Sequence, residues 1–193
     1  MYLKRNKVLY ILGLYLGNYQ NQFYLREISK LTKLPLKTTQ NLIYHLEKER
    51  ILKSAISGKN KYFRLNLENI QTKFYLLHAE IYRTSLFIEK YTPFKTFIKD
   101  IKTNEPLIVF GSFAKFKANG DSDLDLLIIT KEKTALPFHL LAYKVHKMEL
   151  SKNNFIKSLE KQEALIKEIE ENHIILNNHS FYINTMWEHY GRK

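Results

Sequence analysis

The sequence predicts an α+β protein with two folded parts joined by a long helix. Three observations support this fold class. Residues 1–66 hold 13 Lys and Arg against 3 Glu, a net charge of +10, whereas the remaining residues hold 18 against 16, a net charge of +2. Apolar residues recur in steps of four and three over residues 70–88, which is typical of one long helix. Apolar stretches near residues 109–129 carry a Gly-Ser turn and two aspartates.

The first 66 residues begin with helices. An apolar helix is expected from about residue 3 to 17, and a short second helix over residues 24–31. Pro35 interrupts the helical pattern, because it cannot donate a helix hydrogen bond and biases the residue before it away from helical angles. A third helix is expected over residues 36–49, with apolar side chains on one face and polar donors on the other.

Two strands are expected after the third helix, over residues 51–56 and 61–65, with Gly58 in the turn between them. Two helices joined by a tight turn and followed by a basic hairpin resemble the winged-helix fold of many prokaryotic regulators. The segment Leu46-Glu47-Lys48-Glu49-Arg50-Ile51-Leu52 is similar to the junction between helix and hairpin in that family. The resemblance implies that residues 1–66 bind double-stranded DNA.

In the winged-helix fold the third helix enters the major groove, where its first turns reach base edges. We expect Leu42 and Leu46 on its buried face, polar side chains on its exposed face, and basic side chains nearby that meet phosphates. The expected DNA-binding residues are Lys33, Lys37, Thr38, Thr39, Gln40, Asn41, Tyr44, Lys59, Lys61 and Arg64. The charge of +10 favours DNA over a domain that makes only protein contacts.

A connector helix is expected over residues 67–91. Its apolar seam consists of Ile70, Phe74, Leu77, Ile81, Thr84 and Ile88. Two interpretations stay open: the seam packs against the protein's own domains, or it forms a homodimer interface that doubles the contacts to DNA. Thr84 weakens the seam as a dimer interface.

Residues 92–193 mix strands and helices, which predicts a mixed sheet with flanking helices. The expected elements are a helix at 94–102, the strand and turn Val109-Phe110-Gly111-Ser112, the strand Asp123-Leu124-Asp125-Leu126-Leu127-Ile128-Ile129, a third strand at 143–150, a helix after Ser151, a helix at 164–171, and a closing hairpin at 174–176 and 181–184.

The two aspartates are the main indication of chemistry. Residues i and i+2 of a strand point to the same face, so Asp123 and Asp125 converge on one spot. Adjacent carboxylates repel unless a cation lies between them, and Mg²⁺ takes carboxylate and phosphate oxygens together. Gly111 allows the backbone to approach a ligand closely, and Ser112 with the N–H groups after it can cradle a phosphate.

An apolar residue before Gly-Ser, a spacer of about ten residues and then Asp-x-Asp resemble the nucleotidyltransferase superfamily of DNA polymerase beta. The resemblance is closest to its small, minimal branch, in which a serine such as Ser122 precedes the Asp-x-Asp. It implies transfer of a nucleoside monophosphate from a nucleoside triphosphate, with Mg²⁺ or Mn²⁺ as cofactor and with Asp123 and Asp125 as catalytic metal ligands. The nucleotide-binding residues that it implies are Gly111, Ser112, Lys115, Lys117 and Ser122.

The next strand departs from the family pattern. Active members of the superfamily carry a third carboxylate there, and His146 occupies the aligned position. His146 is one candidate for a catalytic base, although a histidine between apolar residues is often structural. Glu149 is a second candidate, but it lies three residues later and would point to the other face of the strand.

The order of 1–66, 67–91 and 92–193 resembles a group of prokaryotic, mainly archaeal, two-domain proteins described as predicted nucleotidyltransferases or regulators. Two functions stay open. One is a DNA-bound, Mg²⁺-dependent nucleotidyltransferase with an unknown acceptor, which the intact Asp-x-Asp favours. The other is a transcriptional regulator with a degenerate domain that only binds a nucleotide or a partner, which the missing third acid favours. An antitoxin-like role that modifies a partner toxin is a third alternative.

The composition sets further limits. The chain has no cysteine, which excludes disulfides and thiolate metal sites and is typical of a reducing compartment. It has no run of about 18 apolar residues and no signal-peptide pattern at its start. We therefore expect a cytoplasmic protein that does not cross a membrane.

Overall fold

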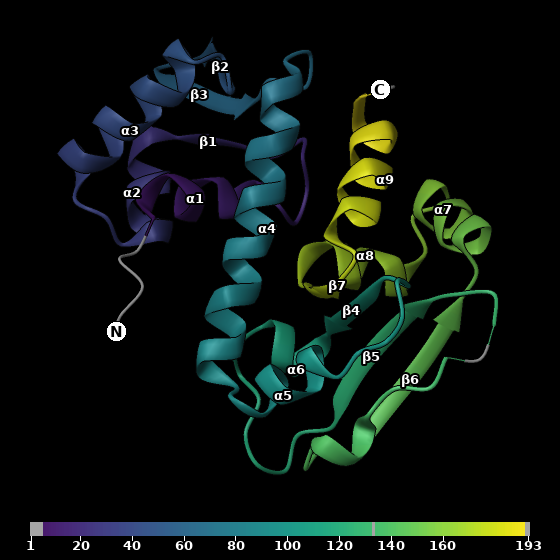
Figure 1. Cartoon of the computed structure of the whole chain (residues 1–193). Helices are drawn as coiled ribbons and strands as arrows, with labels where there is room; N and C mark the ends of the chain where they lie inside the picture. The colour runs from purple at the N-terminus through teal and green to yellow at the C-terminus, as the bar shows by residue number, and fades with distance from the viewer. Residues whose placement is uncertain (1–5, 133, 192–193) are drawn as a thin grey trace. The chain divides into compact units, whose positions relative to one another are not determined.

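The computed structural model describes residues 6–132 and 134–191, so residues 3–5 of the first expected helix lie outside the described part. The chain divides into two compact units, which comprise residues 1–79 with 186–193 and residues 80–185. The division falls within one long helix, α4 (Ile70–Lys90), rather than at the ends of the expected connector. Figure 1 labels the elements of both units.

The first unit combines helices with a three-stranded antiparallel sheet in the order β1–β3–β2 (Figure 1). Its elements are α1 (Lys7–Leu12), the 3-10 helix η1 (Gly13–Tyr15), β1 (Gln22–Tyr24), α2 (Leu25–Thr32), α3 (Leu36–Lys48), β2 (Leu52–Ser57) and β3 (Asn60–Leu65). The second and third helices and the hairpin lie close to where the sequence predicts them, whereas the expected first helix is a shorter α-helix that continues as a 3-10 turn. The short strand β1 is an addition, because three residues are too few to show a pattern of alternation.

Local chemistry accounts for the boundaries of these elements. The side chain of Asn6 caps α1 by accepting a hydrogen bond from the backbone N–H of Leu9 at 3.2 Å. Helix α2 ends at Lys33, which adopts a left-handed conformation with φ of 55°. The β2–β3 hairpin pairs Ser57 with Asn60, and Gly58 in its two-residue turn has φ of 59°, a value that favours glycine.

The core of the first unit joins its helices to its sheet. Side chains from α1, α2, α3 and β3 are fully or almost fully buried, among them those of Ile11, Ile28, Ile43, Leu46 and Phe63. The buried hydroxyl of Tyr15 donates to the backbone carbonyl of Phe63 at 3.0 Å. Burial, and to a lesser degree the charge of Glu27, raises the pKa of the Tyr15 hydroxyl, which therefore stays a neutral donor.

The second unit is built on a mixed four-stranded sheet in the order β6–β5–β4–β7 (Figure 1). Its elements after α4 are α5 (Pro93–Lys99), β4 (Leu107–Phe110), α6 (Gly111–Ala114), β5 (Leu124–Ile129), the 3-10 helix η2 (Phe138–Leu140), β6 (Val145–Leu150), α7 (Lys152–Glu160), α8 (Ala164–Glu171), β7 (Ile174–Asn177) and α9 (His179–Gly191), whose last turns belong to the first unit. Strand β4 pairs antiparallel with β5 and β7, whereas β5 pairs parallel with β6. The mixed sheet with its helices agrees with the predicted α+β class.

Side chains are buried on both faces of this sheet. Leu124, Leu126 and Ile128 of β5 belong to a core cluster that also contains Phe94 and Phe97 of α5. The alternate residues Leu127 and Ile129 point to the opposite face and are also fully buried. The apolar run of β5 is therefore explained by burial on both faces, and Asp125 is the polar interruption in that run.

One expected element of the second unit is wrong. Residues 181–184 were expected to pair with 174–176 in a hairpin, but they lie in α9, and β7 pairs with β4 instead. The side chain of Asn178 accepts a hydrogen bond from the backbone N–H of Phe181 at 3.2 Å, which starts a helix rather than a returning strand.

Helix α4 changes character along its length. Ile70 and Phe74 are both 57% exposed and Ile81 is 44% exposed, so this part of the expected seam faces solvent. Thr84 is buried, and its hydroxyl donates to the backbone carbonyl of Ile175 at 2.8 Å. Ile88 packs against the core cluster of the second unit. The predicted seam therefore consists of two surfaces. The part with Ile70, Phe74 and Ile81 is exposed, and the part with Thr84 and Ile88 is packed within the second unit.

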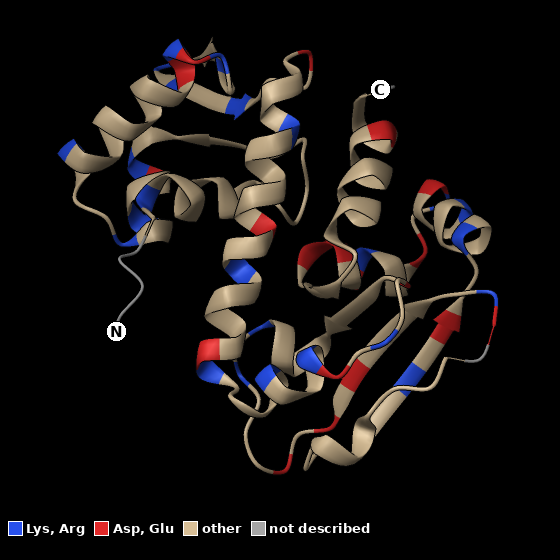
Figure 2. Ribbon diagram, in the orientation of Figure 1, with Lys and Arg blue, Asp and Glu red and all other residues tan. Residues whose placement is uncertain are grey.

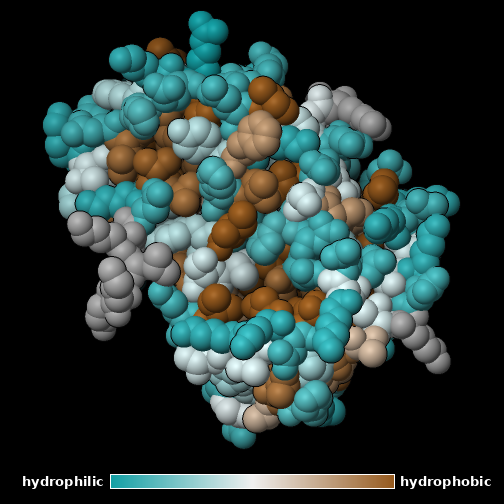
Figure 3. Space-filling model, in the orientation of Figure 1, coloured by the Kyte–Doolittle hydropathy of each residue, from teal (hydrophilic) through white to brown (hydrophobic). Residues whose placement is uncertain are grey.

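Hydrophobic residues, brown in Figure 3, reach the surface on the face that it draws. None of the helices within residues 6–132 and 134–191 combines the length and the apolar character that crossing a membrane requires.

Candidate functional site

The turn between β4 and α6 brings Gly111 against Asp125. Phe110, the last residue of β4, is paired with Asp125 in the antiparallel register, so the next residue lies beside the carboxylate. Gly111 has φ of 68°, a conformation that side-chain-bearing residues rarely adopt. A Cβ atom at Gly111 would overlap Oδ2 of Asp125 and lie 3.2 Å from its Cγ. Both the backbone angle and the space therefore require glycine at this position.

Asp123 and Asp125 flank Leu124, which is fully buried in the core cluster. Their side chains keep 40% and 32% of their surface exposed, respectively. The alternation of the strand thus anchors the backbone through Leu124 and leaves both carboxylates accessible to a ligand, as the i and i+2 spacing predicts.

His146 lies directly beside the two aspartates. The parallel pairing of β5 and β6 places His146 opposite Asp125. Its Nε2 atom is 3.5 Å from Oδ2 of Asp123, and its Nδ1 atom is 3.6 Å from Oδ1 of Asp125. One imidazole ring therefore faces a carboxylate with each of its nitrogens. The side chain of His146 is 51% exposed, so the ring is open to solvent as well.

Glu149 takes no part in this cluster. It is paired with Ile128, whose side chain belongs to the core face of the sheet, and its carboxylate forms an ion pair with Lys147 at 2.8 Å. Of the two candidates for the third functional group, the structure thus brings His146 to the aspartates and leaves Glu149 on the other face.

The loop between α6 and β5 uses several of its predicted nucleotide-binding residues in internal contacts. Lys115 forms an ion pair with Glu168 of α8 at 2.9 Å. The Ser122 hydroxyl donates to the side chain of Asn119 and accepts from its backbone N–H, both at 3.0 Å, so it stabilises the turn. Lys117 is exposed, and its backbone N–H donates to the carbonyl of Ser112 at 3.0 Å.

Lys144 is a site residue that the sequence reasoning missed. Its Nζ atom lies 3.9 Å from Oδ2 of Asp123, and its backbone carbonyl accepts a hydrogen bond from the N–H of Leu124 at 2.8 Å. The lysine precedes the β6 strand by one residue. Only the parallel register of β5 and β6, which the sequence does not specify, brings it to the aspartates.

The donor set at this site suits a hard cation together with a phosphate ligand. Within residues 6–132 and 134–191, no group of three or more His, Cys, Asp or Glu side chains is arranged to hold a metal ion by itself. Mg²⁺ commonly takes only one or two carboxylates from a protein and completes its shell with phosphate oxygens and water. Asp123 and Asp125 therefore fit Mg²⁺ when a triphosphate supplies the other ligands.

Residues 95–181 match the family model described as Polymerase beta, Nucleotidyltransferase. The matched segment contains the Gly-Ser turn, both aspartates and His146, so the C-terminal part of the chain is similar to this family over the residues that form the candidate site. Nucleotidyl transfer is the activity of this family, and its members typically use divalent metal ions. No curated protein and no solved structure gives a significant match to the chain.

Most of the predicted DNA-binding residues are accessible on the first unit. Lys33, Lys37, Asn41, Tyr44, Lys59, Lys61 and Arg64 are exposed, and Thr38 and Gln40 are half-buried. Lys and Arg residues, blue in Figure 2, occur on α2, on α3 and on the hairpin. Lys61 is partly neutralised, because it forms an ion pair with Glu47 at 2.9 Å.

The prediction for Thr39 is wrong. Its side chain is fully buried, and its hydroxyl donates to the carbonyl of Pro35 at 3.1 Å. The buried positions of α3 are Thr39, Ile43 and Leu46, whereas Leu42 is only half-buried. The buried face of α3 is therefore rotated from the face that the apolar residues alone predict. A threonine can occupy a core position when its hydroxyl donates a hydrogen bond within its own helix.

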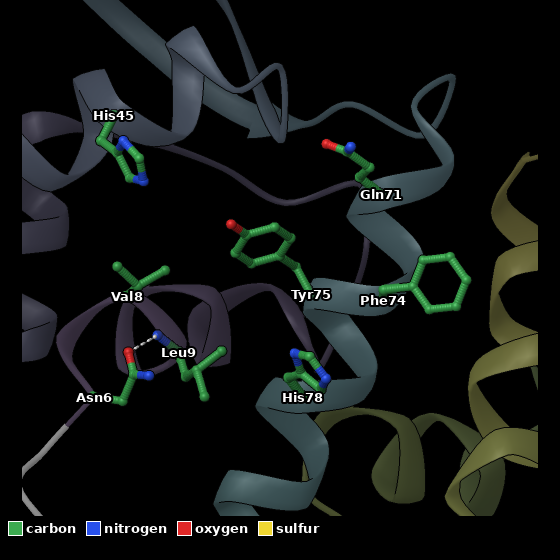
Figure 4. A pocket seen from close by; sticks show the side chains of 8 residues that line it. All are labelled: Asn6, Val8, Leu9, His45, Gln71, Phe74, Tyr75 and His78. Carbon is green, nitrogen blue, oxygen red and sulfur yellow. Dashed lines mark hydrogen bonds between the residues drawn. The ribbon is translucent and has the colours of Figure 1, made fainter.

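The first unit also has a cavity that the sequence does not indicate (Figure 4). Its volume is about 440 Å³, and its lining is mostly apolar. The residues that line it are Asn6, Val8, Leu9, His45, Gln71, Phe74, Tyr75 and His78. They come from α1, α3 and the start of α4, with Asn6 immediately before α1, and their distance from one another in the sequence explains why no motif reveals them.

Proposed function

We propose that the protein is a DNA-binding nucleotidyltransferase that binds a nucleoside triphosphate with Mg²⁺ and transfers its nucleoside monophosphate to an acceptor hydroxyl. The observation that carries this proposal is the cluster of Asp123, Asp125 and His146 beside Gly111, with carboxylate-to-imidazole distances of 3.5 and 3.6 Å. The match of residues 95–181 to the nucleotidyltransferase family supports the reaction class.

In this reaction the acceptor oxygen forms a bond to the α-phosphorus, the bond from that phosphorus to the bridging oxygen breaks, and pyrophosphate leaves. Asp123 and Asp125 would hold Mg²⁺ or Mn²⁺, which supplies charge neutralisation at the phosphates. Gly111 leaves room for the carboxylate of Asp125, and Ser112 with the N–H groups after it holds phosphate oxygens. His146 accepts the proton of the acceptor hydroxyl. Lys144 and Lys117 add positive charge for the departing pyrophosphate.

The role of the aspartates is tested with Asp123→Asn combined with Asp125→Asn. We expect calorimetry with Mg²⁺ and each common nucleoside triphosphate to show binding to the wild type and none to the double variant. Asp121→Asn is the matched control, because Asp121 is an exposed acid of the same loop that lies outside the Asp-x-Asp. Identical titrations of the wild type and the double variant for every nucleotide would contradict the proposal.

A second function is favoured by one observation, namely that a histidine rather than a carboxylate lies across from Asp125 on β6. In this alternative the protein is a DNA-binding regulator whose nucleotidyltransferase domain binds a nucleotide or a partner without turning it over. Incubation with labelled nucleoside triphosphates separates the two functions. Release of pyrophosphate or labelling of an acceptor supports transfer, whereas Mg²⁺-dependent binding without either product supports the regulator.

DNA binding is assigned in this proposal to the first unit. Its support is the net charge of +10 over residues 1–66 and the order of α2, α3 and the β2–β3 hairpin, which is the order of a winged helix. Gln40 and Asn41 would read base edges, and the lysines of the turn and the hairpin would contact phosphates. The acceptor of the nucleotidyl group is not assigned by these residues.

A further inference from the structure

A cleft of about 600 Å³ lies in the first unit between the start of α2, the second half of α3 and the β2–β3 hairpin. The residues that line the cleft include Tyr24, Arg26, Tyr44, Lys59, Lys61 and Phe63. This volume falls within the range of roughly 300–1,000 Å³ that is typical of sites for small ligands. The cleft is therefore large enough to hold one small ligand.

The lining of the cleft alternates cations with aromatic rings. The Nζ atom of Lys61 lies 5.7 Å from the ring centre of Tyr44 and 5.2 Å from that of Phe63. Tyr44 is 48% exposed, although it is a large side chain on a folded helix, so its ring is available to stack on a ligand. Arg26 and Lys59 are exposed at the same cleft and add two more positive charges.

The nearby acids are already engaged. Glu47 accepts hydrogen bonds from Ser54 and from Lys61. Burial tends to raise the pKa of Glu47, but these two hydrogen bonds and the charge of Lys61 together lower it, so the carboxylate stays charged. Glu27 receives the backbone N–H of Tyr24 at 3.4 Å. A ligand can therefore pair with Lys59 and Arg26 without breaking the ion pair between Glu47 and Lys61.

Flat rings combined with cations are the two features that bind unpaired nucleotides, since every base has a face that stacks and every phosphate has a charge. The base edges of a continuous duplex would meet Gln40 and Asn41, and neither of these residues lines the cleft. We propose that this cleft binds an unpaired nucleotide at the end of a nucleic acid strand, with the base stacked on Tyr44 and the phosphates near Arg26 and Lys59. The inference rests on the proposed function only in that the first unit binds nucleic acid.

The test compares labelled duplexes of one sequence, either blunt or with a four-nucleotide single-stranded end, by fluorescence anisotropy with the full chain. Stacking of one base contributes roughly 1–3 kcal/mol, so we expect the duplex with the unpaired end to bind about tenfold more tightly. Tyr44→Ala should remove this advantage, because it should lower the affinity for the duplex with the unpaired end about tenfold more than the affinity for the blunt duplex. Tyr44→Phe should retain it, because phenylalanine keeps the ring.

Lys37→Ala is the matched control, since it should weaken binding to both duplexes by the same factor. Equal affinity of the wild type for the two duplexes would overturn the inference, as would an equal loss for both with Tyr44→Ala. If the duplex with the unpaired end binds and the blunt duplex does not, the inference stands and duplex binding by the first unit is wrong. If AMP alone binds as tightly as the unpaired end and competes with it, the cleft is a site for free nucleotides and the assignment to a strand end is wrong.

Discussion

Gly111 and Asp125 are held together by the backbones of two paired strands, whereas Gln40 and Asn41 project from one helix and are placed by that helix alone. The first pair has almost no freedom, because a single added carbon at Gly111 would overlap the carboxylate. The second pair lies at the surface, because Gln40 is half-buried and Asn41 is exposed. A site fixed by the backbone is sensitive to small changes of shape, whereas a surface on a helix is sensitive mainly to changes of charge and of side-chain chemistry.

The largest expected effect comes from Gly111→Ala. The φ of 68° costs an alanine about 1–2 kcal/mol, and the overlap with Asp125 adds to it, so we expect a total loss of about 2–4 kcal/mol in the free energy of unfolding. Nucleotide binding should be lost as well, since Asp125 must move. Urea unfolding and calorimetry with Mg²⁺ and a nucleoside triphosphate measure the two effects.

Two controls separate the overlap from the backbone angle. In an Asp125→Ala background the remaining Cβ would lie 3.6 Å away, an ordinary contact, so the added alanine should cost only the backbone term of about 1–2 kcal/mol. Gly120→Ala meets no atom within 4 Å and should be almost neutral. Equal losses for Gly111→Ala and Gly120→Ala would show that the turn is not constrained as described.

Helix α4 extends the comparison, because it carries open apolar positions before its buried part. If the open part is a homodimer interface, Leu77→Asp should convert a dimer into a monomer by placing a charge among Ile70, Phe74 and Ile81. Gln71→Asp puts the same charge on an exposed position of the helix that is not part of the apolar seam, and it should leave the dimer intact. Analytical ultracentrifugation gives the answer, and a wild type that sediments as a monomer at micromolar concentration would contradict the interface.

The hairpin provides a smaller and purely electrostatic contrast. Each phosphate contact that is lost should lower the salt slope of duplex binding by about 1. Lys59→Ala should produce this full change, and Lys61→Ala should produce a smaller one, since Lys61 already pairs with Glu47. Lys53 pairs with Glu68 and was not among the expected contacts, so Lys53→Ala should leave the slope unchanged. Gel shifts at several salt concentrations measure these slopes, and slopes independent of both hairpin lysines would rule out their phosphate contacts.

The smallest expected effect concerns Thr39, which lies in the core and not on the surface that we propose to bind DNA. Thr39→Ser removes one buried methyl group and keeps the hydroxyl that donates to Pro35, so it should cost about 1 kcal/mol of stability without changing DNA affinity. Thr38→Ser, one residue away and half-buried, should change stability less. A change in the DNA sequence preference of the Thr39→Ser variant would show instead that Thr39 contacts DNA.

Sequence patterns predict the parts of this protein that depend on neighbours along the chain. The apolar run of β5, the glycine turn and the convergence of Asp123 with Asp125 all follow from spacing, and the structure has them as expected. Features that depend on the pairing of strands were harder to predict. The parallel register of β5 and β6 brings Lys144 to Asp123, and nothing within either strand specifies that register.

Other errors have a different physical origin, which is that residue type does not fix burial or secondary structure. Thr39 occupies a core position because its hydroxyl is satisfied within its own helix. Residues 181–184 begin with Phe, Tyr and Ile, which are common in strands, but the side chain of Asn178 caps a helix there and β7 pairs with β4 instead. A local preference for strand is therefore outweighed where a helix cap and an existing strand partner both oppose it.

The position of β6 at one edge of the four-stranded sheet has a consequence for motion. Asp125 belongs to β5 and Asp123 immediately precedes this strand, which is paired on both sides, whereas His146 belongs to β6, which pairs with β5 only. Edge segments with exposed side chains open more readily than the interior of a sheet. Amide hydrogen exchange should therefore be faster at His146 than at Asp125. Local opening of β6 would move the imidazole of His146 away while the carboxylates of Asp123 and Asp125 stay in place. The cluster would then be lost without unfolding of the domain.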